Sequence, residues 1–181
     1  MIVGVFCSSR QIAALQYETV VIQALHMLFF IFNKRIQISY GGGNKGLMGV
    51  VYRECISNGI TVHGHNLQKW TLPELSQEKI YQNLLERQNG IIESSDMYLI
   101  FPGGIGTIYE LCHVLCNNDV EDKNKIVIVY NIDHLFDTFL DFITELIDKK
   151  LMDRDRLVLH IVTSITEFEE LLITIKNENH F

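Results

Sequence analysis

The segment LIFPGGIGTIYE, residues 99–110, decides how the rest of the chain is interpreted. An apolar run from Met97 to Phe101 meets Pro102 and then three glycines within four residues, and a helical pattern of apolar residues begins at Thr107. This order predicts a strand, a tight turn and a helix. Glycines let a backbone approach a ligand closely, and the free N–H groups at the start of a helix favour an anion, most often a phosphate. The segment therefore predicts a phosphate-binding turn.

A helix cap is an alternative explanation of the same residues. Thr107 and Glu110 have the spacing of a capping box, in which each side chain satisfies a backbone donor at the start of the helix. Gly103 and Gly104 would then serve only to turn the chain. Because a lone glycine-rich turn is a weak motif, this segment by itself leaves both interpretations open.

Length and composition set the class of protein. The chain has 181 residues, 48% of them hydrophobic and 20% charged, which is typical of one globular domain. A net charge of −7 without a basic stripe argues against nucleic acid or an anionic membrane surface as a partner. The N-terminus has no basic region or cleavage pattern, and the most apolar window, Ala24 to Phe32, is too short to span a bilayer. We therefore expect a cytoplasmic protein.

The cysteines show neither a paired framework nor zinc-ligand spacing; they are Cys7, Cys55, Cys112 and Cys116. This usage is typical of small buried residues in a reducing compartment. Cys112 and Cys116 lie four residues apart beside His113, but no second pair of ligands accompanies them. We expect neither a metal nor an organic cofactor.

Strand-like and helix-like patterns alternate along the chain. Apolar runs predict strands at residues 2–6, 36–40, 60–63, 97–101, 126–130 and 157–162. Helical patterns occupy residues 11–33, 47–57, 77–94 and 133–149, and others start at 107 and 164, with loops at 66–76 and 117–125. Because each strand is apolar throughout, we predict a Rossmann-like α/β fold: a doubly wound parallel sheet with helices on both faces. The helix at 11–33 is apolar on nearly all sides, so we expect Phe29, Phe30 and Phe32 to pack against a second subunit as well as the sheet.

Small-residue turns follow three of the predicted strands, at Cys7–Arg10, Gly41–Gly46 and Pro102–Thr107. Ligands of an open parallel sheet bind outside the carboxyl ends of its strands, where the strand order reverses. Three such turns are harder to explain by capping alone, and they favour a binding crevice. No G-x-G-x-x-G follows the first strand and no acidic residue ends the second, so the pattern disfavours NAD.

Two of these turns carry a family resemblance. Residues Pro102–Glu110 match the P-G-G-x-G-T-x-x-E signature of the LOG family, the cytokinin riboside 5'-monophosphate phosphoribohydrolases that were earlier described as lysine decarboxylases. Residues Tyr40–Gly49 match that family's Y-G-G-G-x-x-G-L-M-G turn, and Glu86-Arg87 stands where the family has an E-R-K segment. The chain resembles this family from Ile2 to about Leu172, and we expect residues 1–181 to form a single LOG-like nucleotide-binding domain.

The resemblance implies a site and a reaction. The catalytic pair would be Arg87 and Glu110. Phosphate and ribose contacts would come from Ser8, Ser9, Gly42, Gly43, Gly103, Gly104, Gly106 and Thr107. Breaking the N-glycosidic bond of a nucleoside 5'-monophosphate builds positive charge on the sugar, and a carboxylate can stabilise that charge or orient the attacking water. Arg87 can hold the carboxylate and the ligand in register through its planar fork.

The resemblance also implies the products and the assembly. AMP, or an N6-modified AMP of the cytokinin type, would yield a free base and ribose 5-phosphate. The protein would be a homodimer with its sites near the interface, and the apolar helix at residues 11–33 would contribute to that interface.

Departures from the family pattern leave alternatives open. Gln88 stands where the family commonly has Lys, Ile91 where it has Met, and residues 63–70 lack the usual proline. The preferred base is therefore open between AMP, a cytokinin nucleotide and a pyrimidine nucleotide such as CMP. Gln88 also keeps open a nucleotide-binding carrier of the same fold without turnover.

Other side chains suggest weaker hypotheses. Lys45 fits the Schiff-base lysine of an amino-acid decarboxylase, but a pyridoxal site also needs a partner for the ring nitrogen, so a solvated turn lysine is the better interpretation. His63, His65 and His113 could assist proton transfer, but isolated histidines near strand ends are more often structural.

Overall fold

The computed structural model describes residues 1–70 and 77–178, and in these ranges it shows one seven-stranded sheet. The sheet order is β4-β3-β2-β1-β5-β6-β7, and every neighbouring pair is parallel. The strands are β1 (Ile2–Phe6), β2 (Gln37–Tyr40), β3 (Thr61–Leu67), β4 (Glu78–Tyr81), β5 (Met97–Ile100), β6 (Ile126–Tyr130) and β7 (Leu159–Val162). The helices are α1 (Gln11–Ile31), α2 (Gly46–Ser57), α3 (Leu84–Ser94), α4 (Ile105–Glu121), α5 (Asp137–Asp148), α6 (Arg154–Leu157) and α7 (Ile165–Glu178).

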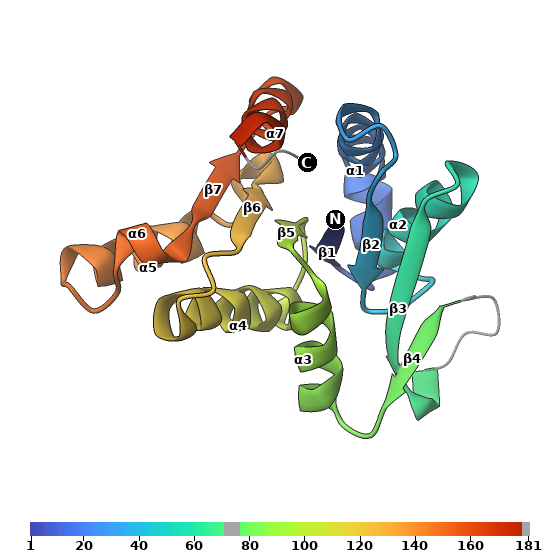
Figure 1. The fold of residues 1–181 in the computed structure, drawn as a ribbon, viewed down its shortest axis with the longest axis horizontal. Coiled ribbons are helices and arrows are strands. Elements are labelled where there is room, and N and C mark those ends of the chain that lie inside the picture. The colour runs from blue at the N-terminus through green and yellow to red at the C-terminus, as the bar shows by residue number, and fades with distance from the viewer. Residues whose placement is uncertain (71–76, 179–181) are drawn as a thin grey trace.

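Two helical layers cover the sheet, as Figure 1 shows. α1, α2 and α7 pack on one face, and α3, α4, α5 and α6 pack on the other. Because successive side chains of a strand point to opposite faces, Val3 and Val5 of β1 enter the first layer and Phe6 enters the second. The predicted doubly wound α/β fold is confirmed.

The α1 helix is the long apolar element of the first layer. Its 21 residues are enough, by length and composition alone, to cross a membrane, so the apolar helix extends well beyond the window from Ala24 to Phe32. A core helix meets the same test, and α1 packs against the sheet, α2 and α7. Phe29 and Phe32 are buried there, whereas Phe30 is 77% exposed.

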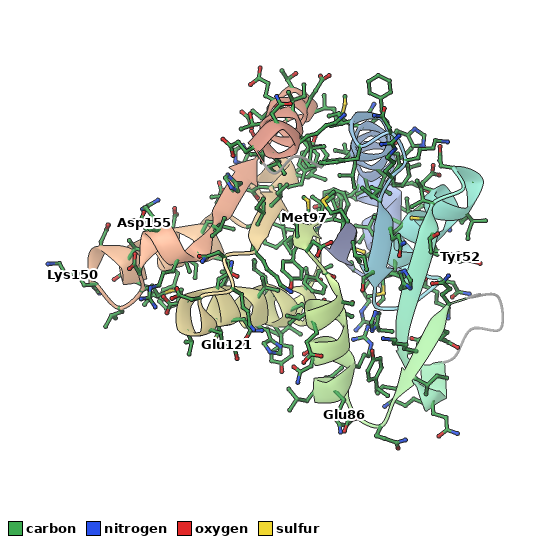
Figure 2. The ribbon with its side chains drawn as sticks, in the orientation of Figure 1. Tyr52, Glu86, Met97, Glu121, Lys150 and Asp155 are labelled. Carbon is green, nitrogen blue, oxygen red and sulfur yellow. The ribbon has the colours of Figure 1, made fainter. Side chains whose placement is uncertain are left out.

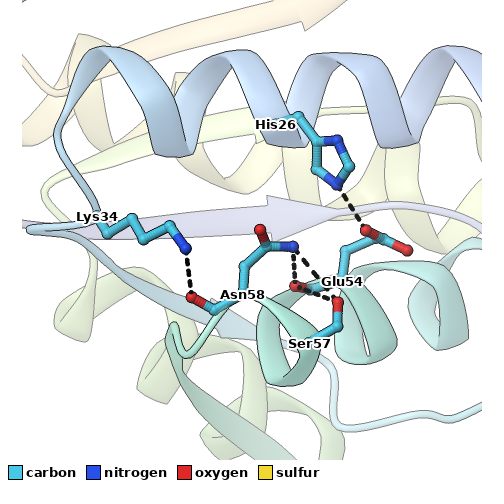
Figure 3. Close-up of polar contacts among 5 residues, drawn as sticks. All are labelled: His26, Lys34, Glu54, Ser57 and Asn58. Carbon is cyan, nitrogen blue, oxygen red and sulfur yellow. Dashed lines mark hydrogen bonds and ion pairs between the residues drawn. The ribbon is translucent and has the colours of Figure 1, made fainter.

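Polar contacts add to the apolar packing between α1 and α2, as Figure 3 shows. His26 Nε2 on α1 lies 2.7 Å from Glu54 Oε2 on α2. Just beyond α1, Lys34 Nζ donates to the carbonyl oxygen of Asn58 at 3.0 Å, at the C-terminal end of α2. A cation beside the last carbonyls of a helix is favourable, so these exposed contacts add modestly to the packing of the C-terminal end of α2 against α1.

One predicted helix proves to be a strand followed by a shorter helix. Residues 77–94 were expected to be helical throughout, but β4 pairs with β3 and α3 begins only at Leu84. Asn83 Oδ1 accepts the N–H of Glu86 at 3.0 Å, and the Glu86 carboxylate accepts from Asn83 Nδ2 at 2.9 Å. This reciprocal cap stops the helix from extending back into β4.

Other differences include the short helix α6, which the sequence pattern does not predict, several element ends and two cysteines. α4 continues to Glu121, through part of the predicted loop at 117–125, and β3 continues to Leu67, into the predicted loop at 66–76. Residues 71–76 of that loop lie outside the described residues. Cys7 and Cys55 are buried as expected, but Cys112 and Cys116 are exposed because they lie on the outer side of α4, away from its buried residues.

Candidate functional site

The three predicted turns leave the same edge of the sheet. They follow β2, β1 and β5, which are neighbouring parallel strands, and the strand order reverses at β1. Backbone hydrogen bonds join the turns: Ser8 N–H donates to Pro102 O at 3.0 Å, and Met48 N–H donates to Ser8 O at 3.3 Å. The structure thus brings together the three segments from which the sequence predicts a site.

The start of α4 argues against the helix cap. The helix begins at Ile105, two residues earlier than expected, and Gly104 occupies the N-cap position without a side-chain cap. The capping-box interpretation is therefore wrong: Thr107 and Glu110 lie inside the helix and are buried. The first N–H groups of a helix have no partner within it, so those at the start of α4 are available to a ligand.

Gly104 and Gly106 have room for a side chain. A Cβ at either position would meet no atom within 4 Å among the described residues, and neither glycine has a positive φ. A glycine inside a helix costs about 1 kcal/mol relative to alanine. Neither the turn nor the packing requires a glycine at position 106. The open space beside Gly106, together with the free N–H groups at the start of α4, therefore favours a bound anion. Gly103 differs, because a Cβ there would lie 2.0 Å from Thr107 Oγ1.

Gly106→Ala tests the phosphate-binding turn. We expect this variant to be more stable than the wild type by about 0.5–1 kcal/mol, because alanine favours the helix. We also expect it to bind AMP at least about tenfold more weakly, or about 1.4 kcal/mol, because the methyl group occupies the space of the phosphate. Urea unfolding and calorimetric titration measure the two effects, with Gly103→Ala as a variant that instead loses stability. AMP binding of Gly106→Ala equal to that of the wild type would contradict the phosphate-binding turn.

The turn after β2 is held by a side chain that the sequence analysis missed. Gly42 has a φ of +71°, which favours glycine, and a Cβ there would lie 2.4 Å from Asn66 Nδ2. Asn66 Nδ2 donates to Gly42 O at 3.1 Å and to Glu78 Oε1 at 2.7 Å. Asn66 lies in the segment that lacks the family's proline, and that departure was the available signal. Gly43 follows in the same turn beside Met48.

The turn after β1 places Ser8 and Ser9 differently. Ser8 is buried, and its Oγ accepts the N–H of Arg10 at 3.0 Å, so its hydroxyl closes the turn. Ser9 is exposed next to Gly46, whose φ is +58°. Lys45 is exposed at the start of α2, as expected of a solvated turn lysine. The roles of both serines in binding stay predictions.

Arg87 extends from α3 to the turn after β2, to β3 and to α4. Its side chain is almost fully buried; Nε donates to His65 O at 2.7 Å and Nη2 donates to Gly41 O at 3.0 Å. Nη1 lies 3.7 Å from Glu110 Oε1, so the structure brings the predicted catalytic pair together. The neighbouring Glu86 is exposed at the outer end of α3 (Figure 2). Of the Glu-Arg motif, only the arginine reaches the site.

Burial controls the charge of Glu110. Removal from water raises the pKa of this carboxyl from 4.5 to about 7, and the guanidinium of Arg87 only partly opposes that effect. Burial also lowers the pKa of Arg87, while Glu110 opposes the change, and an arginine starts so high that it stays charged. A carboxyl group that titrates near neutral pH can accept or donate a proton under physiological conditions.

Known protein families and curated proteins include relatives of this chain. A family model described as "Possible lysine decarboxylase" matches residues 45–175. Cytokinin riboside 5'-monophosphate phosphoribohydrolase LOG2 of Arabidopsis thaliana is 28% identical over 150 residues, which cover 80% of this chain and 69% of that protein. The probable cytokinin riboside 5'-monophosphate phosphoribohydrolase LOG6 of the same plant is 28% identical over 178 residues, which cover 95% of this chain and 86% of that protein.

A solved structure shows the same fold. The Moco carrier protein from Chlamydomonas reinhardtii superposes with a TM-score of 0.69 over 99% of this chain and 98% of that one, at 17% identity. This likeness concerns the fold alone. The family model, by contrast, covers most of the chain, from the start of α2 into α7; it includes the whole of the motif at residues 102–110 and the second half, residues 45–49, of the motif at residues 40–49. The chain therefore belongs to the family described as possible lysine decarboxylases, which is the LOG family.

Proposed function

We propose that this protein hydrolyses the N-glycosidic bond of a nucleoside 5'-monophosphate, either AMP or a cytokinin-type N6-modified AMP. The products are a free base and ribose 5-phosphate. The observation that carries the proposal is the buried Arg87–Glu110 pair, which lies close to the uncapped start of α4. Membership of the family and the names of the curated relatives support it.

The substrate is held by its phosphate. The free N–H groups at the start of α4 donate to the phosphate oxygens, and Gly104 and Gly106 leave room for them. The turns after β1 and β2 leave the same edge of the sheet as this position and contact the ribose through Ser9 and Gly43. Glu110 follows Gly106 by four residues, about 6 Å along the helix axis, so a ribose can connect the phosphate to a reacting C1' near the carboxylate.

Glu110 acts on the developing charge. As the C1'–N bond breaks, its electron pair leaves with the base and positive charge builds on C1' and the ring oxygen. The carboxylate stabilises this charge or orients the water whose oxygen bonds to C1', and the proton released by the water balances the charge on the departing base. Arg87 keeps the carboxylate in place through their ion pair.

A panel of nucleotides tests the proposal. The protein is incubated with AMP, isopentenyl-AMP, CMP, GMP and UMP, and chromatography detects the free base. Release from AMP or isopentenyl-AMP is the expected result, whereas release from CMP alone would make the protein a pyrimidine nucleotide N-glycosidase. Binding without release from any of the five would overturn the enzyme in favour of a nucleotide carrier. The carrier is the alternative that Gln88 keeps open, because this residue stands where the family commonly has Lys. Its side chain is buried, and its Oε1 has no hydrogen-bond partner in the described part of the chain.

The proposed enzyme is a cytoplasmic homodimer, as the family resemblance implies. Large apolar side chains exposed on α1 and α4 supply surface for such an assembly; they include Ile12, Leu15, Phe30, Ile105, Tyr109 and Val120. Light scattering after size exclusion measures the mass, and a mass equal to that of one chain would contradict the dimer.

A further inference from the structure

A chain of hydrogen bonds runs through the structure behind Arg87. The hydroxyl of Tyr81 on β4 lies 2.8 Å from His65 Nδ1 on β3, and His65 Nε2 lies 3.0 Å from Ser39 Oγ on β2. Ser39 Oγ lies 3.1 Å from Ser94 Oγ on α3, and Ser94 Oγ donates to Ile91 O at 3.1 Å. Four side chains therefore connect three neighbouring strands to the helix that carries Arg87.

The end of this chain fixes the direction of every bond in it. A carbonyl oxygen only accepts, so Ser94 uses its one proton on Ile91 O and must accept from Ser39. Ser39 has then used its own proton, so it accepts from a protonated Nε2 of His65. Nδ1 of the neutral ring is left as an acceptor, and Tyr81 donates to it. One tautomer of His65 satisfies all four bonds.

The surroundings keep His65 neutral. The ring is almost completely buried, and burial lowers its pKa to about 4. The positive charges nearest to it, on Lys79 and Arg87, act in the same direction, and so does His63. At neutral pH the donor and acceptor roles in these hydrogen bonds therefore stay the same.

His65 and Tyr81 both contact the elements that place Arg87. The carbonyl oxygen of His65 accepts from Arg87 Nε at 2.7 Å, so the position of this residue sets the position of the guanidinium. The rings of His65 and Tyr81 stack with centroids 5.6 Å apart. Tyr81 also lies against α3 at Gly90, where a Cβ would come within 2.0 Å of the hydroxyl. This close approach explains a glycine in the middle of a helix, which otherwise destabilises it.

We propose that His65 is a positioning residue for Arg87, held in place by the hydrogen-bond chain that begins at Tyr81. The chain fixes α3 against the strands, and the backbone carbonyl of His65 then directs the guanidinium toward Glu110. The proposal rests on the proposed function only for its effect on turnover. The placement of Arg87 itself is independent of which substrate the protein takes.

Tyr81→Phe breaks the chain at its first bond and keeps the stacked ring. We expect the Nε–H of Arg87, followed by ¹⁵N NMR, to exchange with water at least about tenfold faster, because its acceptor is no longer fixed. We expect kcat to fall about tenfold while KM changes less than about twofold, because the guanidinium serves the reacting centre. Ser94→Ala breaks the other end of the chain and is expected to act in the same direction.

Tyr98→Phe is the matched control. Tyr98 is fully buried, whereas Tyr81 is partly buried, and the Tyr98 hydroxyl donates to Ile92 O of the same helix at 2.7 Å instead of to His65. The Tyr98→Phe variant also loses one tyrosine hydrogen bond, so we expect its free energy of unfolding to fall by a similar amount. The exchange rate of the Arg87 Nε–H and kcat should both stay unchanged. If Tyr98→Phe and Tyr81→Phe speed the exchange of the Arg87 Nε–H equally, the hydrogen bonds from Tyr81 to Ser94 only help to hold α3 in place. That result would overturn the proposal.

The tautomer of His65 gives a readout that does not depend on activity. Its ¹⁵N shifts are expected to show Nε2–H and an unprotonated Nδ1 from about pH 5.5 to 8, because titration occurs well below this range. A Nδ1–H tautomer, or protonation near pH 6.5, would contradict the directed chain. If no nucleotide is hydrolysed, the proposed function fails while the NMR results still decide the positioning role. If turnover is present and Arg87 exchange is unchanged in folded Tyr81→Phe, the positioning role alone fails.

Discussion

Glu110→Gln is expected to lower nucleotide turnover about 10³-fold, because the amide cannot carry the negative charge that opposes the positive charge on the sugar. The amide has nearly the same shape as the carboxyl group, so the helix and the burial of this position are preserved. The rate of base release per folded molecule is the measurement. A glutamine variant that keeps its turnover would show that Glu110 has only a structural role.

The same variant is expected to be more stable than the wild type above pH 7. The pKa of Glu110 rises from 4.5 in the unfolded chain to about 7 in the folded protein. Between these values the folded state holds a proton that the unfolded state has lost, so stability falls as the pH rises through this window. The free energy of unfolding of the wild type falls by about 3 kcal/mol over this window, at 1.36 kcal/mol for each pH unit. Glutamine does not ionise, so the variant does not lose this free energy. Urea unfolding at pH 4.5 and pH 8 should therefore show the advantage of Glu110→Gln only at pH 8.

Glu86→Gln is the control for this experiment. Glu86 belongs to the same sequence motif as Arg87, but it is exposed and its carboxylate caps α3 through Asn83. Glutamine serves equally well in a capping box, so turnover and stability should both stay near those of the wild type. A large loss of turnover in Glu86→Gln would indicate that the exposed end of α3 takes part in the site.

The sequence could predict the sheet because its strands are buried on both faces. Continuous apolar runs such as 97–101 and 126–130 can lie only between two helical layers, and they coincide closely with β5 and β6. The positions of the turns follow from the same pattern, since parallel strands end at one edge. This is why the segments carrying Ser8, Gly42 and Gly104 could be expected to converge before any contact between them was known.

The first residues of helices were harder to predict, because the residue spacing of a capping box also occurs inside a helix. Thr107 and Glu110 have capping-box spacing but lie buried within α4, whereas Asn83 and Glu86 have it and do cap α3. The difference is made by burial, which one-dimensional spacing does not contain. The bonds from Arg87 to the carbonyls of His65 and Gly41 were also beyond prediction, because every residue has a carbonyl group.

Arg87→Lys is expected to lower turnover at least about 10²-fold and to destabilise the protein by about 3 kcal/mol. Lysine has a single ammonium group, which cannot reach His65 O, Gly41 O and Glu110 together as the planar guanidinium does. Buried acceptors are then left unpaired, at about 1–3 kcal/mol for each group. Base release and urea unfolding at pH 8 measure the two effects.

Arg53→Lys is the matched control, because Arg53 pairs with Glu18 at 3.0 Å on the exposed surface. Exposed pairs contribute about 1 kcal/mol or less, so turnover and stability should change little. Retention of wild-type stability in Arg87→Lys would contradict the anchoring role of the two carbonyls. At pH 8, Arg87→Lys and Glu110→Gln are expected to change stability in opposite directions while both lower turnover. Unfolding cannot explain a loss of activity that accompanies a gain in stability, so the pair of variants together assigns the chemistry to the site.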